Sequence, residues 1–158
     1  MHNIVLQLYD STLQGQWDDF VENSRNGIFL FKRNFMDYHS DRFKDNSLIF
    51  REKGNIIAVL PANLEKDILY SHQGLTYGGM IVSNSMKQEK MLECISLLID
   101  YMKQNGIHKL IYKQIPHIFS NYPSQEDVYA LFINVATSRP YTSLSLYCMN
   151  KSYNRWLL

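Results

Sequence analysis

The sequence predicts an α/β (α+β) domain in which a mixed, mostly antiparallel sheet is flanked by helices. Three observations predict this class: short alternating apolar segments fill the first half, one long amphipathic helix follows, and a strand–helix–strand pattern comes last. Consecutive hairpins pair their strands antiparallel, whereas a crossover through a helix pairs them in parallel. The sheet is therefore expected to be mixed, with helices packed on it.

Composition and charge exclude several classes of protein. The chain has 158 residues, 46% of them hydrophobic and 20% charged, which is ordinary for one globular domain spanning residues 1–158. This composition excludes a disordered chain, a coiled coil and a collagen-like repeat. The 16 basic and 15 acidic side chains leave a formal charge of +1, so no electrostatic argument favours a nucleic-acid partner.

The sequence also predicts the compartment. No basic N-terminal region precedes a long apolar run, so no signal peptide is expected. The longest apolar runs, such as residues 56–61, are far shorter than the roughly 20 residues that a membrane helix needs. Cys94 and Cys148 match no metal spacing, so we expect no metal site, and we expect no disulfide because nothing else suggests an oxidising compartment. A cytoplasmic protein is predicted.

Strands and helices alternate through the first half of the chain. Apolar side chains alternate over 4–8, which predicts a strand, and Asp10 and Ser11 then cap a helix that carries Trp17. After a turn at Asn26 and Gly27, a short helix is expected over 35–42, followed by strands over 47–51, 56–60, 68–72 and 75–82. The first two of these strands are joined by a hairpin turn at residues 53–55.

The clearest element of the second half is a helix over residues 87–105. Its apolar side chains recur on one face at 3.6 residues per turn: Met91, Leu92, Ile95, Leu98, Ile99 and Met102. Gly106 provides the C-terminal cap. A strand over 107–115, a helix that begins at 124–127 with a capping-box pattern, and a last strand within 141–148 complete the predicted order.

Several segments resemble a known family. The segments are residues 35–43 (FMDYHSDRF), 60–63 (LPAN), 71–79 (SHQGLTYGG), 112–116 (YKQIP) and 123–132 (PSQEDVYALF). They resemble a bacterial group of acetyltransferase-like proteins that are related to the Fem peptidoglycan aminoacyltransferases and share the GCN5-related N-acetyltransferase fold. This group usually carries two such domains in tandem. The resemblance implies that the chain corresponds to the N-terminal domain, and it fades after Ile133.

The resemblance implies transfer of an acyl group to an amine, with acetyl-coenzyme A or another acyl donor. Such a fold opens its sheet at the central strands to admit a pantetheine arm, and a glycine-rich turn before the long helix holds the pyrophosphate. Here that connection, residues 81–88, contains no glycine. Ser83, Asn84 and Ser85 are the cofactor-binding candidates, because they can cap the helix and its N-terminus can bind an anion.

Tyr77, Gly78 and Gly79 are the first substrate-binding candidates. They can line a groove, with the Tyr77 hydroxyl as a catalytic hydrogen-bond donor or acid. The alternative is a bulged strand with a packed tyrosine, in which adjacent glycines mark a close approach by another segment.

Basic and acidic side chains supply the other candidates. His39 and Arg42 share a predicted helical face near the place where Fem-type enzymes carry a basic residue for substrate phosphate; the alternative for His39 is a bond to a neighbouring aspartate. Lys113 either contacts an anionic substrate group or is solvated. Glu126 either acts as a catalytic base or, together with Asp127, caps its helix.

Two functions therefore compete. The first is an N-acyltransferase of the Fem-like type that acts on an amine, such as a small molecule or a peptidoglycan precursor, and is not self-sufficient as a single domain. The second is a non-catalytic substrate-binding or truncated half-transferase module. Because a domain that evolved against a partner exposes an apolar patch when alone, we also expect a homodimer.

Overall fold

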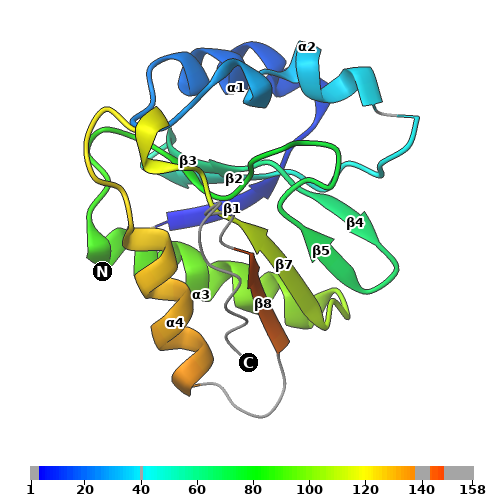
Figure 1. Ribbon diagram of the computed structural model, residues 1–158, viewed down its shortest axis with the longest axis vertical. Coiled ribbons are helices and arrows are strands. Elements are labelled where there is room, and N and C mark those ends of the chain that lie inside the picture. The colour runs from blue at the N-terminus through cyan, green and yellow to red at the C-terminus, as the bar shows by residue number, and fades with distance from the viewer. Residues whose placement is uncertain (1–3, 40, 138–142, 148–158) are drawn as a thin grey trace.

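The computed structural model describes residues 4–39, 41–137 and 143–147, with side chains described except at 39, 135–137 and 143–147. Its strands form two four-stranded sheets between two layers of helices (Figure 1). The predicted class, a mixed and mostly antiparallel arrangement flanked by helices, is confirmed. The strands divide between two sheets, however, where one sheet was expected.

The first sheet has the order β1-β2-β3-β6 and is antiparallel throughout. Its strands are β1 (Ile4–Leu8), β2 (Leu48–Glu52), β3 (Asn55–Leu60) and β6 (Ile81–Val82). The predicted hairpin turn joins β2 to β3, and Lys53 and Gly54 there have φ values of 51° and 84°. Two consecutive left-handed residues give a two-residue turn the twist that the flanking strands need.

The second sheet has the order β4-β5-β7-β8. Its strands are β4 (Asn63–Glu65), β5 (Ile68–Tyr70), β7 (Lys109–Lys113) and β8 (Ser143–Tyr147). The β4–β5 pair is antiparallel, and β7 pairs in parallel with both β5 and β8. The short strand β4 was not predicted, whereas a strand–helix–strand crossover, which gives parallel pairing, was.

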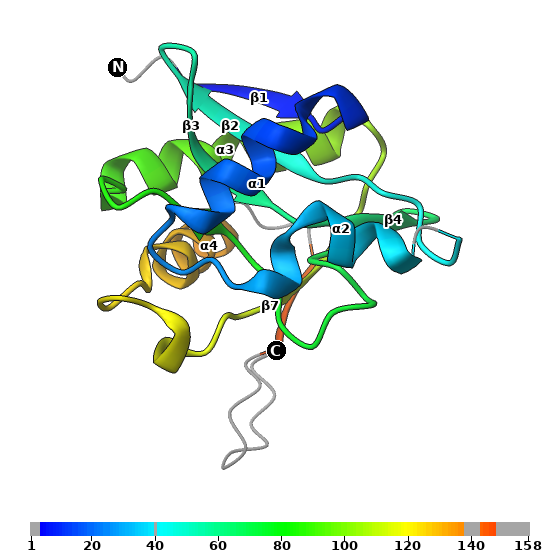
Figure 2. The same cartoon turned by 90° about the horizontal axis from the view of Figure 1, so that it is seen from above.

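Helices cover both faces. On one side lie η1 (Ser11–Leu13), α1 (Gln14–Glu22), η2 (Phe29–Phe31), α2 (Arg33–Met36) and η3 (Asp37–His39); Figure 2 shows α1 lying across β2 and β3. On the other side lie α3 (Gln88–Gln104) and α4 (Glu126–Thr137), with η4 (His117–Phe119) in the connection between β7 and α4. The helix predicted over 35–42 is found only up to His39, as the end of α2 followed by η3; residues 41 and 42 lie in a turn, and Asp45 beyond it pairs with the Arg33 guanidinium.

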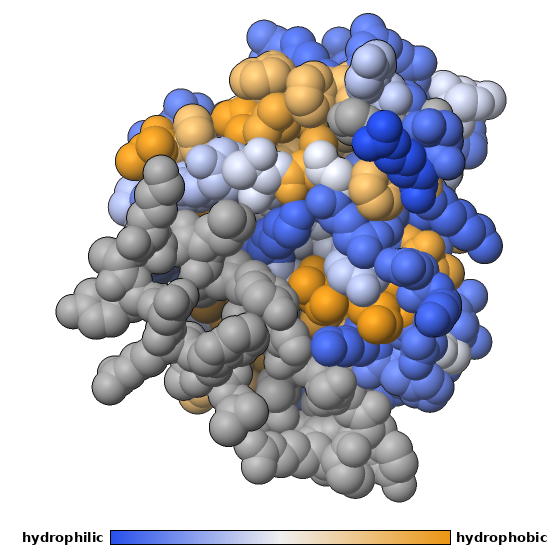
Figure 3. Space-filling view, turned by 45° about the vertical axis from the view of Figure 1, so that its right-hand side comes forward, coloured by the Kyte–Doolittle hydropathy of each residue, from blue (hydrophilic) through white to orange (hydrophobic). Residues whose placement is uncertain are grey.

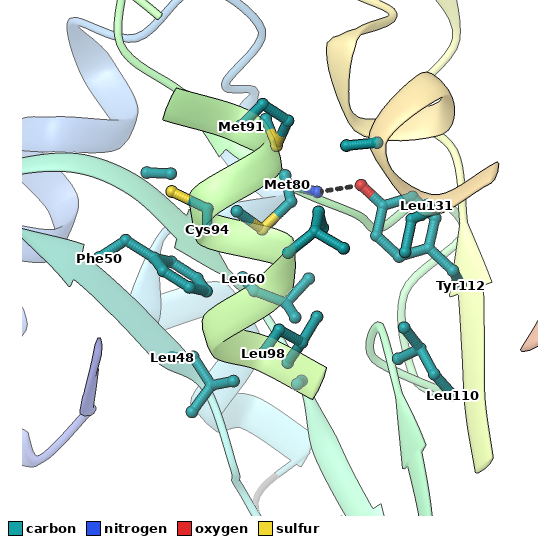
Figure 4. Packing of buried hydrophobic residues seen from close by; sticks show 14 of the residues in the cluster. Leu48, Phe50, Leu60, Met80, Met91, Cys94, Leu98, Leu110, Tyr112 and Leu131 are labelled. Atoms are coloured by element: carbon teal, nitrogen blue, oxygen red, sulfur yellow. Dashed lines mark hydrogen bonds between the residues drawn. The ribbon is translucent and has the colours of Figure 1, made fainter. Parts of the chain in front are cut away.

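Alternate residues of the first sheet face opposite layers, as the period of a strand requires. Ile49, Val59 and Ile81 pack with Trp17 and Val21 of α1. The opposite face carries Leu48, Phe50 and Leu60, which pack against α3 (Figure 4), and Val82, which belongs to the same buried cluster. The predicted apolar face of α3 is buried there through Met91, Cys94, Ile95, Leu98 and Met102, and Gly106 follows with a φ of 66°.

The predicted strand over 75–82 is wrong except for its last two residues. Residues 72–80 form a loop, and β5 ends at Tyr70. A Cβ on Gly78 would lie 2.0 Å from the Ser71 carbonyl oxygen, so the loop packs its backbone on the end of β5. The carbonyls of His72, Gln73 and Leu75 bind the Lys113 ammonium instead of a neighbouring strand. Most of the other differences are one or two residues at element ends.

Candidate functional site

The outer edge of β6, opposite β3, is hydrogen-bonded by groups of the chain itself. The Val82 N–H donates to Asn26 Oδ1 over 2.9 Å, and the Val82 carbonyl accepts from the Arg25 N–H over 2.8 Å. The Met80 carbonyl accepts from Asn26 Nδ2 over 2.9 Å, and the Met80 N–H donates to Tyr112 Oη over 2.7 Å (Figure 4). The turn after α1 and a side chain of β7 therefore occupy the place of a neighbouring strand.

The Tyr112 hydroxyl connects this edge to α4. It donates a hydrogen bond to the Asp127 carboxylate, and both side chains are buried. Burial raises the pKa of Asp127, while hydrogen bonds from Tyr112 and from the Val128 N–H oppose this rise. Burial, followed by the charge of Asp127, raises the pKa of Tyr112 well above its ordinary value. The pair ties β7, the β6 edge and α4 together away from solvent.

Arg25, a buried arginine in the turn after α1, binds the connection between β6 and α3 with its side chain. The Arg25 side chain is 5% exposed and pairs with Glu126 over 2.6 Å. Its guanidinium also donates to the backbone carbonyls of Asn84 and Met86 over 3.2 and 2.8 Å, and it lies 5.3 Å from the Tyr122 ring centroid. The turn before α3 thus directs two carbonyl oxygens at an internal cation.

These contacts fix the connection between β6 and α3, which contains none of the glycines that a conventional coenzyme A pyrophosphate site uses. A pyrophosphate cradle needs backbone N–H groups facing outward and glycines that allow close approach. The prediction that Ser83, Asn84 and Ser85 cap the helix is wrong, because Lys87 is the N-cap residue and its side chain makes no capping bond. Ser83 and Ser85 pair with each other through their hydroxyls, 3.2 Å apart. Asn84 binds Tyr122 and the Asn23 carbonyl.

Lys113, at the end of β7, holds the loop of residues 72–80. Its Nζ donates to the carbonyls of His72, Gln73 and Leu75 over 3.1, 3.3 and 2.6 Å. Desolvation in this half-buried position lowers the pKa of Lys113. The sequence left an anion contact and a solvated lysine as alternatives; the structure shows a third arrangement, in which the ammonium binds three backbone oxygens of one loop.

The two adjacent glycines lie where the same loop meets the sheet. The close approach at Gly78 is to the Ser71 carbonyl, and a Cβ on Gly79, whose φ is 94°, would lie 2.7 Å from the Lys113 carbonyl oxygen. Ser71 Oγ in turn accepts from the Lys113 N–H over 2.7 Å. Segments of the chain itself make the close approach that adjacent glycines predicted.

The beginning of the loop is held from the other side as well. Gln73 and Asn63 exchange two hydrogen bonds of 2.7 and 2.6 Å, and Gln73 Nε2 reaches Glu65 over 3.0 Å. The Phe43 ring packs against Gly74 and lies 5.7 Å from the His72 ring. The loop is therefore fixed by β4, β7 and the segment that carries Arg42.

Three predicted site residues border this loop or the segment next to it. Arg42 is exposed, with Asp41 as an exposed partner at 4.0 Å. Tyr77 is half-buried, and its ring centroid lies 5.3 Å from that of Phe119. His39 ends η3, and its side chain lies outside the described part of the structure.

A second buried arginine fixes the segment between η3 and β2. Arg33 is 2% exposed and pairs with Asp37 and Asp45 over 2.9 and 3.0 Å. Its guanidinium carbon lies 3.7 Å from the Tyr9 ring centroid. These contacts tie the backbone on both sides of Arg42 to the molecule.

The structure thus divides the predicted candidates into two groups. The first group is at the loop of residues 72–80. Tyr77, Gly78 and Gly79 lie within this loop, and Arg42 and Lys113 lie in segments that hold it. Asn84 and Glu126 meet around Arg25. Sequence reasoning missed Arg25, Asn26 and the role of Tyr112, and only the turn signal at Asn26 and Gly27 marked this region.

Within residues 4–39, 41–137 and 143–147, no helix is long and apolar enough to cross a membrane. Among the same described residues, no group of three histidine, cysteine, aspartate or glutamate side chains is placed to hold a metal ion.

Comparison with known proteins finds matches among solved structures. No protein-family model matches the chain, and no curated protein matches it. It is similar to the ribosomal-protein-S18-alanine N-acetyltransferase from Escherichia coli, with 12% identity and a TM-score of 0.48, over 68% of this chain and 64% of that one. It is also similar to the aminoglycoside N-acetyltransferase AAC(6')-Iy in complex with coenzyme A, with 12% identity and a TM-score of 0.49, over 96% and 97% of the two chains.

Proposed function

We propose that the chain is the acceptor-binding domain of an N-acyltransferase of the Fem-like type and that it holds an amine-bearing substrate on the loop of residues 72–80. The resemblance of its sequence segments to that group favours this reaction class. The observation that carries the proposal is the fixation of this loop by the three carbonyl contacts of Lys113. An irregular loop held this firmly is preorganised for binding, because little conformational entropy remains to be lost.

The side chains beside the loop have the chemistry that such a substrate needs. Arg42 is 70% exposed, and the backbone on both sides of it is anchored through Asp37 and Asp45, which pair with Arg33. An exposed guanidinium on an anchored backbone suits a phosphate or carboxylate group of a precursor. The hydroxyl of Tyr77 is a hydrogen-bond donor from within the loop, and His39 is a further candidate for the anionic group.

We propose further that this domain does not hold the acyl donor and that a second domain or a second copy supplies it. In the reaction the amine nitrogen forms a bond to the acyl carbon, the bond from that carbon to its carrier breaks, and the amine proton passes to a base. Glu126 is paired with Arg25, and Asp127 with Tyr112. Because both carboxylates are engaged, a base from a partner fits better.

An exposed apolar surface supports the partner. Phe29 and Phe35 are 67% and 39% exposed, and their rings meet edge to face at 5.5 Å. Figure 3 shows apolar side chains gathered on the surface at the end of the molecule where α1 and α2 lie. Sedimentation at micromolar concentration tests a homodimer, and a strict monomer would contradict that version of the partner.

Calorimetric titration with a peptidoglycan precursor that carries a free lysine amine tests the acceptor site. We expect the wild type to bind and Arg42→Ala to weaken binding by roughly tenfold or more, as loss of a charged hydrogen bond does. Lys103→Ala is the matched control, because it removes one exposed cation from the last turn of α3. An absence of binding by the wild type, or equal losses in the two variants, would contradict the proposal.

The alternative is a non-catalytic binding module. It is favoured because the two candidate bases of this domain, the Glu126 and Asp127 carboxylates, are already engaged. Transfer would then need a base from a partner. Mass spectrometry of the precursor after incubation with the protein and an acyl donor distinguishes the two. Binding without acylation supports the module, whereas an acylated amine supports the transferase.

A further inference from the structure

We infer that the amide side chain of Asn26 takes the place of a neighbouring strand along β6, so that the domain accepts no extended ligand, coenzyme A included, between its two sheets. This inference goes beyond the proposed function, since it concerns a different part of the molecule. It rests on the hydrogen bonds of the β6 edge and on the packing of the turn that carries Asn26.

A primary amide can replace a peptide group because it offers one carbonyl oxygen and an N–H on adjacent atoms. Asn26 uses both: its Oδ1 accepts from the Val82 N–H, and its Nδ2 donates to the Met80 carbonyl, each over 2.9 Å. Backbone groups two residues apart on one edge of a strand are those that a paired strand would bind. The Arg25 N–H and the Tyr112 hydroxyl bind the remaining two edge groups.

The residues along the β6 edge are also buried from solvent. Met80 and Tyr112 are fully buried, Val82 is 1% exposed and Asn26 is 5% exposed. An extended ligand would have to break four buried hydrogen bonds and replace every one of them. Each group left unpaired would carry the full penalty of a buried polar atom.

The turn that carries Asn26 cannot simply move aside. Ser24 Oγ donates to the Val21 carbonyl over 2.7 Å, and Arg25 is bound to Glu126 and to two carbonyls of the turn before α3. A Cβ on Gly27 would lie 2.3 Å from the Val21 carbonyl oxygen, so the end of α1 closes tightly on the turn. Movement of Asn26 would therefore disrupt the end of α1 and the Arg25 contacts together.

Amide hydrogen exchange followed by NMR on the whole chain tests the inference. In the wild type we expect the Met80 and Val82 amides to exchange as slowly as the centre of the first sheet. We also expect millimolar acetyl-coenzyme A to leave both exchange rates unchanged. Exchange at the rate of an open strand edge, or slowing of these amides by acetyl-coenzyme A, would overturn the inference.

Two variants separate the contacts. Asn26→Ala should speed exchange at the Val82 amide by about ten- to hundredfold, as expected when a buried donor loses its acceptor. Tyr112→Phe should do so at the Met80 amide and leave Val82 slow. The matched control is Asn23→Ala, an exposed asparagine at the end of α1, which should change neither rate. Equal acceleration in Asn26→Ala and Asn23→Ala would contradict the inference; if Asn26→Ala does not fold, the wild-type rates decide.

The outcome is independent of the proposed function. Precursor binding reads the surface beside Arg42, whereas exchange at Met80 and Val82 reads the β6 edge. A failure of precursor binding would leave the closed edge standing, and an open edge would leave the acceptor surface standing.

Discussion

The hydroxyl of Tyr112 donates to the carboxylate of Asp127 at the point where the two sheets meet α4. The same oxygen accepts from the Met80 N–H over 2.7 Å, so one phenol connects three elements that are far apart in the chain. Because both side chains are buried, the carboxylate at this junction links stability to pH.

Asp127→Asn should change the pH dependence of stability. Burial raises the pKa of Asp127 in the folded protein above its unfolded value of about 4. The folded chain then retains a proton that the unfolded chain releases, so the free energy of unfolding falls as pH rises from about 4 through the folded pKa. Asparagine cannot titrate and should abolish this fall. Urea unfolding of both proteins between about pH 3.5 and 7 measures it.

Asp100→Asn serves as the control for that experiment, because Asp100 is exposed on α3. It should follow the wild-type pH profile. A constant difference between Asp127→Asn and wild type over the whole range would show that the carboxyl pKa is not raised on folding.

Lys113→Met should release the loop of residues 72–80. The variant keeps much of the buried aliphatic stem but removes the donor to three carbonyls, which should cost about 1–3 kcal/mol of unfolding free energy. Hydrogen exchange with mass spectrometry should show faster exchange in peptides that cover the loop. Lys109→Met, on the same strand, should leave those peptides unchanged; equal effects of the two substitutions would contradict the assigned role.

Gly78→Ala should destabilise the protein strongly. The added methyl group would lie 2.0 Å from the Ser71 carbonyl oxygen, and backbone cannot yield as a flexible side chain can. We expect a loss of roughly 3 kcal/mol in the free energy of unfolding, at the upper end of overpacking effects. Gly15→Ala is the control: nothing lies within 4 Å of its Cβ position in α1, so it should stabilise the protein by about 0.5–1 kcal/mol. Similar unfolding curves for the two variants would show that Gly78 is not closely packed.

Arg25→Ala should cost about 3–5 kcal/mol of unfolding free energy, because it leaves the partly buried Glu126 and the carbonyls of Asn84 and Met86 without their cation. Thermal and urea unfolding measure the loss. Lys32→Ala removes the partner of Glu22 from an exposed ion pair, which solvent screens, and should leave the unfolding curve almost unchanged. A small effect of Arg25→Ala would mean that the turn before α3 does not depend on this cation.

Local patterns in the sequence predicted the elements whose stability comes from their own neighbourhood. The helix α3 was found from its apolar face, and the β2–β3 hairpin from Lys53 and Gly54. Both signals act between residues a few positions apart. The alternation of strands and helices was sufficient for the fold class as well.

The candidate site was predictable only in part. The adjacent glycines correctly predicted a close approach at Gly78, but no sequence pattern identified the Ser71 carbonyl as the group that makes it. The carbonyl contacts of Lys113 are with residues about 40 positions earlier, and a single lysine on a strand has no periodic signal. Most of the segment 75–82 was wrongly predicted as a strand, because its residues are largely apolar although they lie mostly in a loop.

By itself, then, the sequence determined the class of fold, the long helix, the hairpin and the absence of glycine before α3, since each depends on residue type and short spacing. Only the tertiary structure decided that Asn26 meets Val82, that Tyr112 meets Asp127, and that the sheets are joined by side chains. The physical reason is that a buried polar side chain forms hydrogen bonds with the groups that folding places beside it. That placement depends on the packing of segments 15 to 56 residues apart in the chain.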